Sequence, residues 1–309
     1  MVNYEKSGHG APAPRRWVYA MLVGCMLLWG GTWPVGRFLA GSMIPVNAAL
    51  IRFVLASVVL SLMCLAVYGK SMFRIRRDLW LSLILLGTSG VFGYSLLFFK
   101  GLQSTDAGRA ALIIGCTPVC IAALSAVLER RCLAWPVMVG IVLSLLGGMV
   151  VIAKGNWRGL LSGQLSSGDV MIFGCVLLWT VYTLLARPVM KTIPPLITVA
   201  WSCIVGTVLL LPFALANGLG QDIVGVGNSE WLALVYLGVL ATALAYYWYY
   251  LAIRQVGTAV TGIFINLVPL FAVLLSGVFL KERLHWSSAL GGVLVIAGVF
   301  VTVLAGNRK

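Results

Sequence analysis

Residues 24–29 read GCMLLW and residues 174–179 read GCVLLW, so the chain contains nearly the same hexamer twice, 150 positions apart. Further identical residues recur in both halves at this offset or at an offset of 151. The matched pairs are Arg37 and Arg187, Pro45 and Pro195, Trp80 and Trp231, Gly87 and Gly238, Pro118 and Pro269, Ser125 and Ser276, Trp135 and Trp286, Gly140 and Gly291, and Gly147 and Gly298. Self-similarity over both halves indicates one structural unit used twice.

The composition of the whole chain is that of a membrane protein. Of the 309 residues, 61% are hydrophobic and only 10% are charged, and the mean hydropathy is +1.02. Soluble domains carry roughly 25% charged residues, so a soluble globular fold is excluded. Apolar stretches of about 20 residues, the length that a helix needs to cross a bilayer, recur along the chain. Ten spans are expected, at 17–36, 46–68, 79–100, 108–128, 133–153, 169–187, 196–216, 230–250, 258–280 and 286–305.

The expected spans are helical, because they show no alternation of apolar and polar residues and because lipid does not tolerate unpaired backbone groups. Each copy of the repeat holds five spans, and an odd number makes the second copy enter the membrane from the opposite side. The fold class is therefore an all-α membrane protein with ten transmembrane helices in a 5+5 inverted repeat. Inverted repeats recur in secondary transporters, whose substrate site lies between the halves. The expected divisions are a cytoplasmic tail (1–16), a first repeat (17–153), a linker (154–168) and a second repeat (169–309).

The formal net charge of +14 indicates membrane topology and not a nucleic-acid partner, because the basic residues are scattered through short loops. With the N-terminus in the cytoplasm, fourteen of the 22 Lys and Arg residues lie on the inside, and Arg52 lies within a span. Seven fall on the outside, namely Arg37, Lys100, Arg109, Lys154, Arg158, Lys281 and Arg283. Basic residues favour cytoplasmic loops, so we expect both termini in the cytoplasm and the linker outside. The tail has no apolar core, so no cleavable signal peptide is expected.

Motifs for catalysis and for cofactors are sparse. Seven cysteines form no CxxC pair, and Cys116 and Cys120 lie one turn apart with no histidine near them in the chain, which favours packing over metal binding. GTSG at 87–90 has the GxSG form of rhomboid-type serine proteases, but the two histidines, His9 and His285, lie in the tail and in a loop. A serine nucleophile needs a base, so an intramembrane enzyme is a remote alternative. No metal-, ATP- or NAD-binding motif occurs, and no cofactor is expected.

Four stretches resemble the motifs of a known family. They are LLWGGTWPVGR at 27–37, IRF at 51–53, GLQSTDAGRAALIIGCTPV at 101–119 and the residues from Tyr250 to Val299. The chain resembles EamA-type members of the drug/metabolite transporter superfamily, which include an aromatic amino acid exporter branch. The resemblance implies export of small metabolites across a bacterial inner membrane. One departure is that the second copy has the family's KERL at 281–284, whereas the first has RRCL at 130–133 with its acid moved to Glu129.

Aromatic residues at helical spacing mark a candidate substrate cavity. Spacings of three or four residues place each pair on one helix face. The candidates are Trp29, Trp33, Tyr94, Phe98, Trp179 and Tyr182, together with Tyr246 and Tyr250 of the YYWYY run at 246–250. Two interpretations stay open at this point. Binding pockets favour aromatic walls, but Trp and Tyr also gather in belts at membrane interfaces, as expected for Trp17, Trp80, Trp231 and Trp286.

Two prolines within expected spans predict kinks. Pro118 and Pro269 each leave the carbonyl four residues earlier, at Ile114 and Ile265, without its backbone donor. Their matching positions favour a pair of hinges, although common ancestry of the halves would also preserve them. Asn266 beside the second proline is either a hydrogen-bond donor to substrate or a bond between helices.

Charged residues are nearly absent from the spans. The acids Asp106, Glu129, Asp169, Glu230 and Glu282 fall at span ends, so we expect no built-in proton relay. Arg52 lies inside a span, where it either extends to the interface, gates the pathway or binds a carboxylate. Small-residue stripes on the fifth and tenth spans predict close helix packing. Their members are Gly140, Ser144, Gly147, Gly148, Gly291, Gly292 and Gly298.

These observations predict a secondary exporter of small organic metabolites that works by alternating access between inverted repeats. The aromatic residues favour neutral and aromatic amino acids as substrates, because stacking rewards flat apolar side chains. The alternative is a facilitator or exchanger of other metabolites or drugs, such as sugars or nucleotide derivatives. The expected partners are a small-molecule substrate and the lipid bilayer, and the protein is expected to be a monomer or a homodimer.

Overall fold

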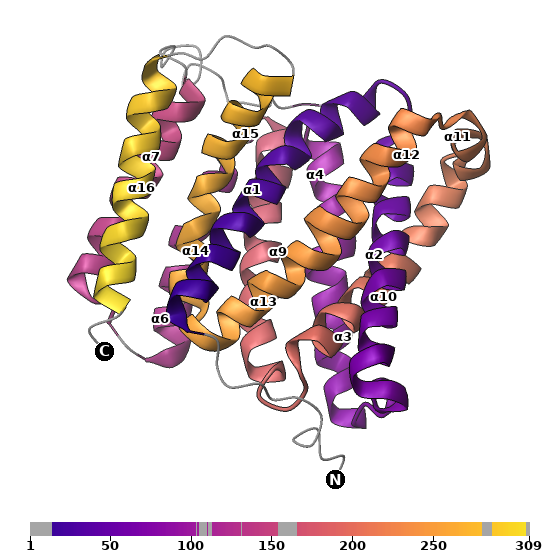
Figure 1. Cartoon of the computed structure of the whole chain (residues 1–309), viewed down its shortest axis with the longest axis horizontal. Coiled ribbons are helices and arrows are strands. Elements are labelled where there is room, and N and C mark those ends of the chain that lie inside the picture. Colours follow the sequence, from indigo (N-terminus) through magenta and orange to yellow (C-terminus); the bar gives the residue numbers. More distant parts are fainter. Residues whose placement is uncertain are drawn as a thin grey trace.

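The computed structural model of the chain describes residues 14–102, 104, 110, 113–130, 132–153, 166–279 and 286–306. Within these ranges every regular element is a helix (Figure 1). The tail before Pro14, the linker residues 154–165, Asp106 and Glu282 lie outside the described residues. The first helix begins and the last helix ends at the same end of the bundle, which we call the terminal side (Figure 1).

Both repeats contain helices in the same order. The first repeat consists of α1 (Arg15–Ala40), α2 (Pro45–Tyr68), η2 (Gly69–Phe73), η3 (Arg77–Leu79), α3 (Trp80–Gly87), η4 (Thr88–Gly93), α4 (Tyr94–Leu102), α6 (Thr117–Glu129) and α7 (Trp135–Ala153). The second consists of α9 (Ser167–Val189), α10 (Pro195–Ala216), α11 (Leu219–Gly225), α12 (Asn228–Val235), η5 (Tyr236–Leu244), α13 (Ala245–Val256), α14 (Thr258–Ile263), η6 (Phe264–Asn266), α15 (Leu267–Phe279) and α16 (Trp286–Gly306). The described chain thus confirms an all-helical fold built from two similar halves.

Seven helical segments are long and apolar enough to cross a membrane, and three shorter ones are also apolar. The long segments are Arg15–Gly36, Pro45–Phe73, Arg77–Gly101, Ser167–Val189, Pro195–Ala216, Asn228–Val256 and Thr258–Leu275, and the shorter ones are Ile113–Glu129, Trp135–Val150 and Ala289–Leu304. Each coincides with one of the apolar stretches expected from sequence. A multi-pass helical membrane protein is therefore supported, whereas a count of ten crossings stays a prediction.

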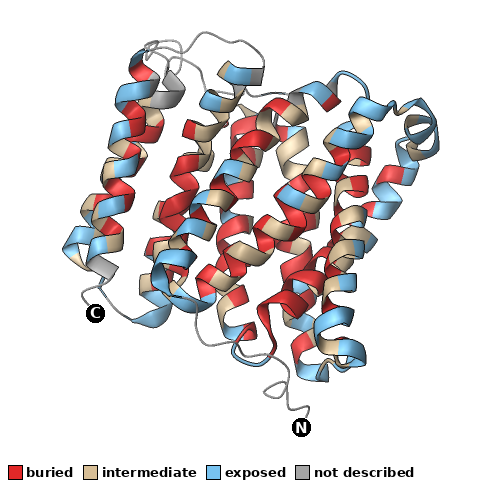
Figure 2. Ribbon diagram, viewed as in Figure 1, coloured by how far each residue is buried: buried red, intermediate tan, exposed pale blue. Residues whose placement is uncertain are grey.

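Apolar side chains face outward as well as inward, as a lipid environment requires. Buried residues follow the inner faces of the helices, and exposed ones follow the outer faces (Figure 2). Leu62 on α2, Val142 on α7, Val208 on α10 and Phe300 on α16 each expose between 54% and 62% of their surface. Contact of such side chains with lipid costs no free energy, whereas their exposure to water would be unfavourable.

The two repeats cross each other through equivalent contacts. A Cβ atom on Gly87 would lie 2.8 Å from the carbonyl oxygen of Ser202, and one on Gly238 would lie 2.9 Å from the carbonyl oxygen of Arg52. Gly87 corresponds to Gly238, and Arg52 corresponds to Ser202. The third helical segment of each repeat therefore packs its glycine against the second helix of the other repeat, at a distance that a side chain would prevent.

The pair α7 and α16 lies side by side at one edge of the bundle (Figure 1). A Cβ on Gly140 would lie 2.6 Å from the Gly298 carbonyl oxygen, and one on Gly147 would lie 2.7 Å from that of Gly291. The repeat relates these two contacts to each other, because Gly140 corresponds to Gly291 and Gly147 corresponds to Gly298. The close packing predicted from the small-residue stripes is confirmed at these glycines.

Candidate functional site

A cavity of about 490 Å³ lies between the two repeats. In the first repeat, α1, α2, α4 and α6 contribute side chains to its wall, and in the second repeat α9, η5, α13, η6 and α15 do so. Its wall follows α1 and the start of α2 from Trp29 through Leu39 and Met43 to the exposed Pro45. The α1–α2 corner, residues 39–49, therefore forms one end of the cavity.

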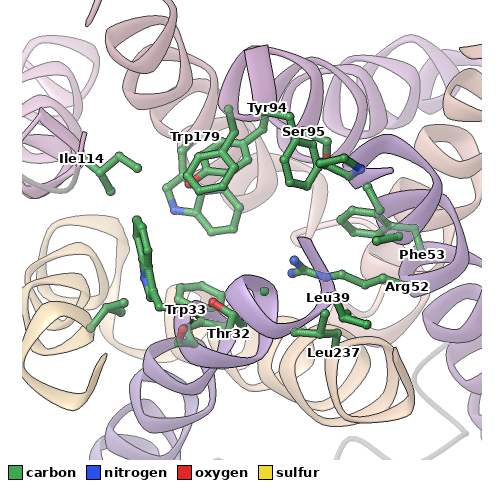
Figure 3. A pocket seen from close by; sticks show the side chains of 18 of the residues that line it. Thr32, Trp33, Leu39, Arg52, Phe53, Tyr94, Ser95, Ile114, Trp179 and Leu237 are labelled. Carbon is green, nitrogen blue, oxygen red and sulfur yellow. Dashed lines mark hydrogen bonds between the residues drawn. The ribbon is translucent and has the colours of Figure 1, made fainter. Parts of the chain in front are cut away.

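Aromatic rings form a continuous wall. The centroid of Trp29 lies 5.3 Å from that of Trp179 and 5.7 Å from that of Tyr246, and Tyr94 lies 5.5 Å from Trp179. Phe98 stacks on Tyr94 with centroids 5.9 Å apart. Figure 3 shows Tyr94 and Trp179 on one side of the cavity and Trp33 on another. The wall is locked in place in part by the indole N–H of Trp29, which donates to the Ala241 carbonyl at 3.0 Å.

The predicted aromatic candidates separate into two groups. Six line the cavity, namely Trp29, Trp33, Tyr94, Phe98, Trp179 and Tyr246. The other two, Tyr182 and Tyr250, are fully buried and are not among the lining residues. Asn266 is also buried, and its amide nitrogen donates to the Ser144 hydroxyl on α7 at 2.8 Å. The structure thus places Asn266 in a bond between helices and outside the lining of the cavity.

Arg52 on α2 is half-buried and lines the cavity. Its Nε donates to the hydroxyl oxygen of Thr242 at 2.6 Å, and its guanidinium carbon lies 5.0 Å from the ring centroid of Phe53. Thr242 belongs to η5, a π-helical stretch of the second repeat. The equivalent segment of the first repeat, η4, is π-helical too. Such wide turns often occur at functional sites, and this one positions a hydroxyl for the arginine.

The helix that carries Pro118 is interrupted as the missing backbone bond requires. Cys116 forms a turn, α6 begins at Thr117, and the Thr117 hydroxyl donates to the Ile114 carbonyl at 2.5 Å. This is the carbonyl that Pro118 leaves without its backbone donor.

At Pro269 the matching interruption is the tight η6 turn, just before α15. The carbonyl that Pro269 leaves without its backbone donor belongs to Ile265, within η6. Ile114 and Ile265 both line the cavity, so both irregular turns border it.

The terminal side of the pathway is closed. The α9–α10 corner, residues 189–199, is the equivalent of the α1–α2 corner and lies at the other end of the bundle (Figure 1). Residues 193–200 are all buried. Above them, the hydroxyls of Thr183 and Tyr249 bond at 3.0 Å, and both residues are fully buried. Glu129 at the end of α6 forms an ion pair with Arg187 near the end of α9, which joins the two repeats on this side.

The comparison with known proteins agrees with this two-repeat arrangement. Residues 16–153 and residues 166–304 each match the EamA-like transporter family. The chain belongs to the EamA-like transporter family. The resemblance seen in the sequence is confirmed, and the two matched segments contain the two repeats that enclose the cavity.

Relatives of this EamA-family chain are transporters by name. The uncharacterized transporter YyaM of Bacillus subtilis is 28% identical over 91% of this chain and 92% of its own length. An uncharacterized transporter of Archaeoglobus fulgidus is 30% identical over 92% of this chain and 96% of its own length. The aromatic amino acid exporter YddG of Ancylobacter novellus is 25% identical over 78% of this chain and 80% of its own length. A solved crystal structure shares the fold, with a TM-score of 0.77, 22% identity, and coverage of 95% of this chain and 98% of its own.

Two features of the family member's site were not anticipated from sequence. Thr242 as the partner of Arg52 lies 190 positions away, and the Glu129–Arg187 pair joins residues 58 positions apart. The repeat was the one signal in the sequence that bears on these contacts. It places Arg187 at the same position as Arg37, near the end of an equivalent helix.

Proposed function

We propose that this protein is a secondary exporter of small organic metabolites, and that neutral and aromatic amino acids fit its site best. The observation that carries the proposal is the cavity between the repeats, whose wall contains three tryptophans and two tyrosines. Aromatic walls with a few polar groups favour ligands that present a flat apolar surface. The name of the relative YddG, an aromatic amino acid exporter, supports the same substrate class.

The proposed mechanism is alternating access. The α1–α2 corner opens while the α9–α10 corner is packed, and the two exchange environments as the repeats rock against each other. We place both termini in the cytoplasm of a bacterial cell, the protein in the inner membrane as a monomer or homodimer, and the open cavity toward the outside. A reporter protein that works only in the cytoplasm should then be active when fused after residue 72 and inactive when fused after residue 160. A reporter that works only outside the cytoplasm should show the opposite pattern. The reverse pattern would invert the proposed direction.

The substrate class is tested with proteoliposomes loaded with labelled phenylalanine, tryptophan, threonine or glucose. We expect exchange of phenylalanine and tryptophan, slower exchange of threonine and none of glucose. Trp179→Ala should slow exchange, whereas Trp135→Ala, at a side chain that is 73% exposed on the outer face of α7, should not. Exchange of glucose without any amino acid would favour the alternative of a sugar facilitator and overturn the proposal.

A further inference from the structure

The cavity wall contains one charged side chain among its described residues, Arg52. A cation inside a membrane protein is costly unless an opposite charge or hydrogen-bond acceptors satisfy it. None of the described lining residues is an acid, and the ion pairs found among described residues lie elsewhere, between Arg76 and Asp78 and between Arg187 and Glu129. Among the described residues, therefore, no opposite charge compensates Arg52 at the edge of the aromatic cavity.

Arg52 is held toward the cavity and does not extend to the membrane interface. Its Nε bond to Thr242 at 2.6 Å fixes it to the opposite repeat, and the Thr242 hydroxyl in turn donates to the Leu237 carbonyl at 2.7 Å. Thr242 is fully buried, so this anchor is shielded from water. In Figure 3 the terminal nitrogens of Arg52 point into the cavity, on the far side from Trp33.

The anchor uses one of the five N–H donors of the guanidinium. The four donors on the two terminal nitrogens have no acceptor among the described residues. Two parallel donors of this kind match a carboxylate in bidentate geometry. A ligand carboxylate would supply the charge and the acceptors that the described residues do not provide.

A ligand ammonium group would find fewer favourable contacts in the cavity than a carboxylate. The hydroxyl oxygens of Thr32 and Thr117, whose hydrogens go to the Trp29 carbonyl at 2.6 Å and the Ile114 carbonyl at 2.5 Å, can still accept a hydrogen bond but carry no negative charge. With no carboxylate among the described lining residues, only aromatic faces and neutral oxygens are left to receive a positive charge. Repulsion by Arg52 opposes a net cation in the same space.

We propose that the cavity selects apolar carboxylates, with Arg52 binding the carboxylate and the aromatic wall holding the apolar body, and that an α-amino group is dispensable. This inference rests on the proposed function, because it names the class to which the exported amino acids belong. Amino acids are then one kind of substrate among monocarboxylates that carry a flat apolar group.

The test is a matched ligand series on the full chain in lipid nanodiscs, with binding measured by calorimetry. The four probes share a phenyl group on a two-carbon chain: phenylalanine, 3-phenylpropanoate, 2-phenylethylamine and 2-phenylethanol. We expect phenylalanine and 3-phenylpropanoate to bind with dissociation constants within about threefold of each other. The amine and the alcohol should bind about tenfold or more weakly, since charge-assisted hydrogen bonds are worth that factor or more.

Variants assign the effect to Arg52. Arg52→Gln should weaken both carboxylates by about 10- to 100-fold and leave 2-phenylethanol unchanged, and Arg52→Lys should restore part of the loss without the bidentate geometry. Thr242→Val removes the anchor and should weaken the carboxylates less. Its matched control is Thr180→Val, because Thr180 is equally buried and bonds its own helix, at the Val176 carbonyl, but does not line the cavity.

The possible outcomes separate this inference from the proposed function. If 2-phenylethylamine binds as tightly as 3-phenylpropanoate, the carboxylate selectivity is wrong while export of aromatic compounds stands. If 3-phenylpropanoate binds through Arg52 but proteoliposomes carry neither it nor phenylalanine, the selectivity stands and the export proposal fails. If none of the four probes binds, or if Arg52→Gln binds both carboxylates as the parent does, the inference is overturned.

Discussion

The α1–α2 corner and the α9–α10 corner are matched in sequence, but only the first borders the cavity. Leu39, Met43 and Ala49 are 2%, 6% and 5% exposed, and all three line the cavity. Their equivalents 150 positions later are Val189, Ile193 and Val199, which are 3%, 2% and 0% exposed in the packed core. Side chains of similar kind thus border the cavity at one end of the bundle and pack in the core at the other.

The two repeats also differ at a second set of matched positions, deeper in the bundle. Trp33 and Phe98 face the cavity with ring centroids 5.9 Å apart. Their equivalents, Thr183 and Tyr249, are buried and joined by a hydroxyl bond of 3.0 Å. Hydroxyls that must be buried need a partner, and these supply each other's. At these positions the second repeat is therefore packed and hydrogen-bonded where the first repeat faces the cavity, as expected when the two exchange roles.

The largest effect is expected from a wedge in each corner. Ala49→Trp should obstruct closure of the α1–α2 corner, and Val199→Trp should obstruct closure of the α9–α10 corner. Overpacking costs about 1–3 kcal/mol, which shifts an equilibrium between two access states by roughly 5- to 150-fold. Both variants should lose tenfold or more of transport, measured as phenylalanine exchange in proteoliposomes.

Labelling with a thiol reagent distinguishes the two wedges. Reporter substitutions Met43→Cys and Ile193→Cys sit at matched positions, in a background where the exposed Cys132 is replaced by Ser. With Ala49→Trp the first reporter should label and the second should stay protected, and Val199→Trp should reverse this. Identical labelling in both variants would show that the corners do not exchange environments.

A smaller effect is expected from the two interrupted helices. Pro118→Ala and Pro269→Ala restore a backbone donor to the Ile114 and Ile265 carbonyls, so each helix should straighten. We expect both variants to insert and fold while transport slows by roughly three- to tenfold, because a stiffer helix disfavours one access state. The two variants should bias the corner reporters in opposite directions. Parental rates with unchanged labelling in both would make the prolines packing features only.

The fold could be predicted from sequence further than the site. Helix positions followed from apolar stretches, because bilayer thickness dictates their length, and the repeat followed from matched residues such as Trp80 and Trp231. The π-helical turns η4 and η5 were missed, since a uniformly apolar stretch carries no signal of helical width. The hydrogen bond from Arg52 to Thr242 depends on η5, so it was not predicted either.

The aromatic candidates show a second limit. Tyr182 and Tyr250 have the same spacing and chemistry as the lining residues but are fully buried and are not among those that line the cavity. A repeat in sequence identifies equivalent residues, such as Trp29 and Trp179, but it does not say which access state the fold adopts. Asn266 illustrates the remaining ambiguity, because its Ser144 partner is 122 positions away in another helix.

The ion pair on the closed side should have a modest effect. Glu129→Gln or Arg187→Gln removes a half-exposed pair worth about 0.2–1 kcal/mol, so labelling of Ile193→Cys should rise by roughly 1.5- to fivefold. The charge-reversed double variant, Glu129→Arg with Arg187→Glu, should restore protection. The control is Asp78→Asn, which breaks the local pair with Arg76 in the loop before α3 and should leave labelling unchanged. Equal labelling in all of these variants would show that the pair does not hold the closed side.

The smallest effect is expected from pH, because three of the described carboxylates have structural partners and none of the described acids lines the cavity. Asp222 accepts bonds from the Ile44 backbone and the Asn47 side chain, Asp169 forms the capping box of α9, and Glu129 pairs with Arg187.

None of the described lining residues is an acid that could carry a proton through the cavity. Transport in proteoliposomes should run down the substrate gradient and change by less than about twofold when a gradient of one pH unit is imposed, whereas full coupling to one proton would shift the driving force by about 1.4 kcal/mol. A strict proton requirement would contradict this prediction. It would direct attention to Glu230 at the start of α12, to be tested as Glu230→Gln.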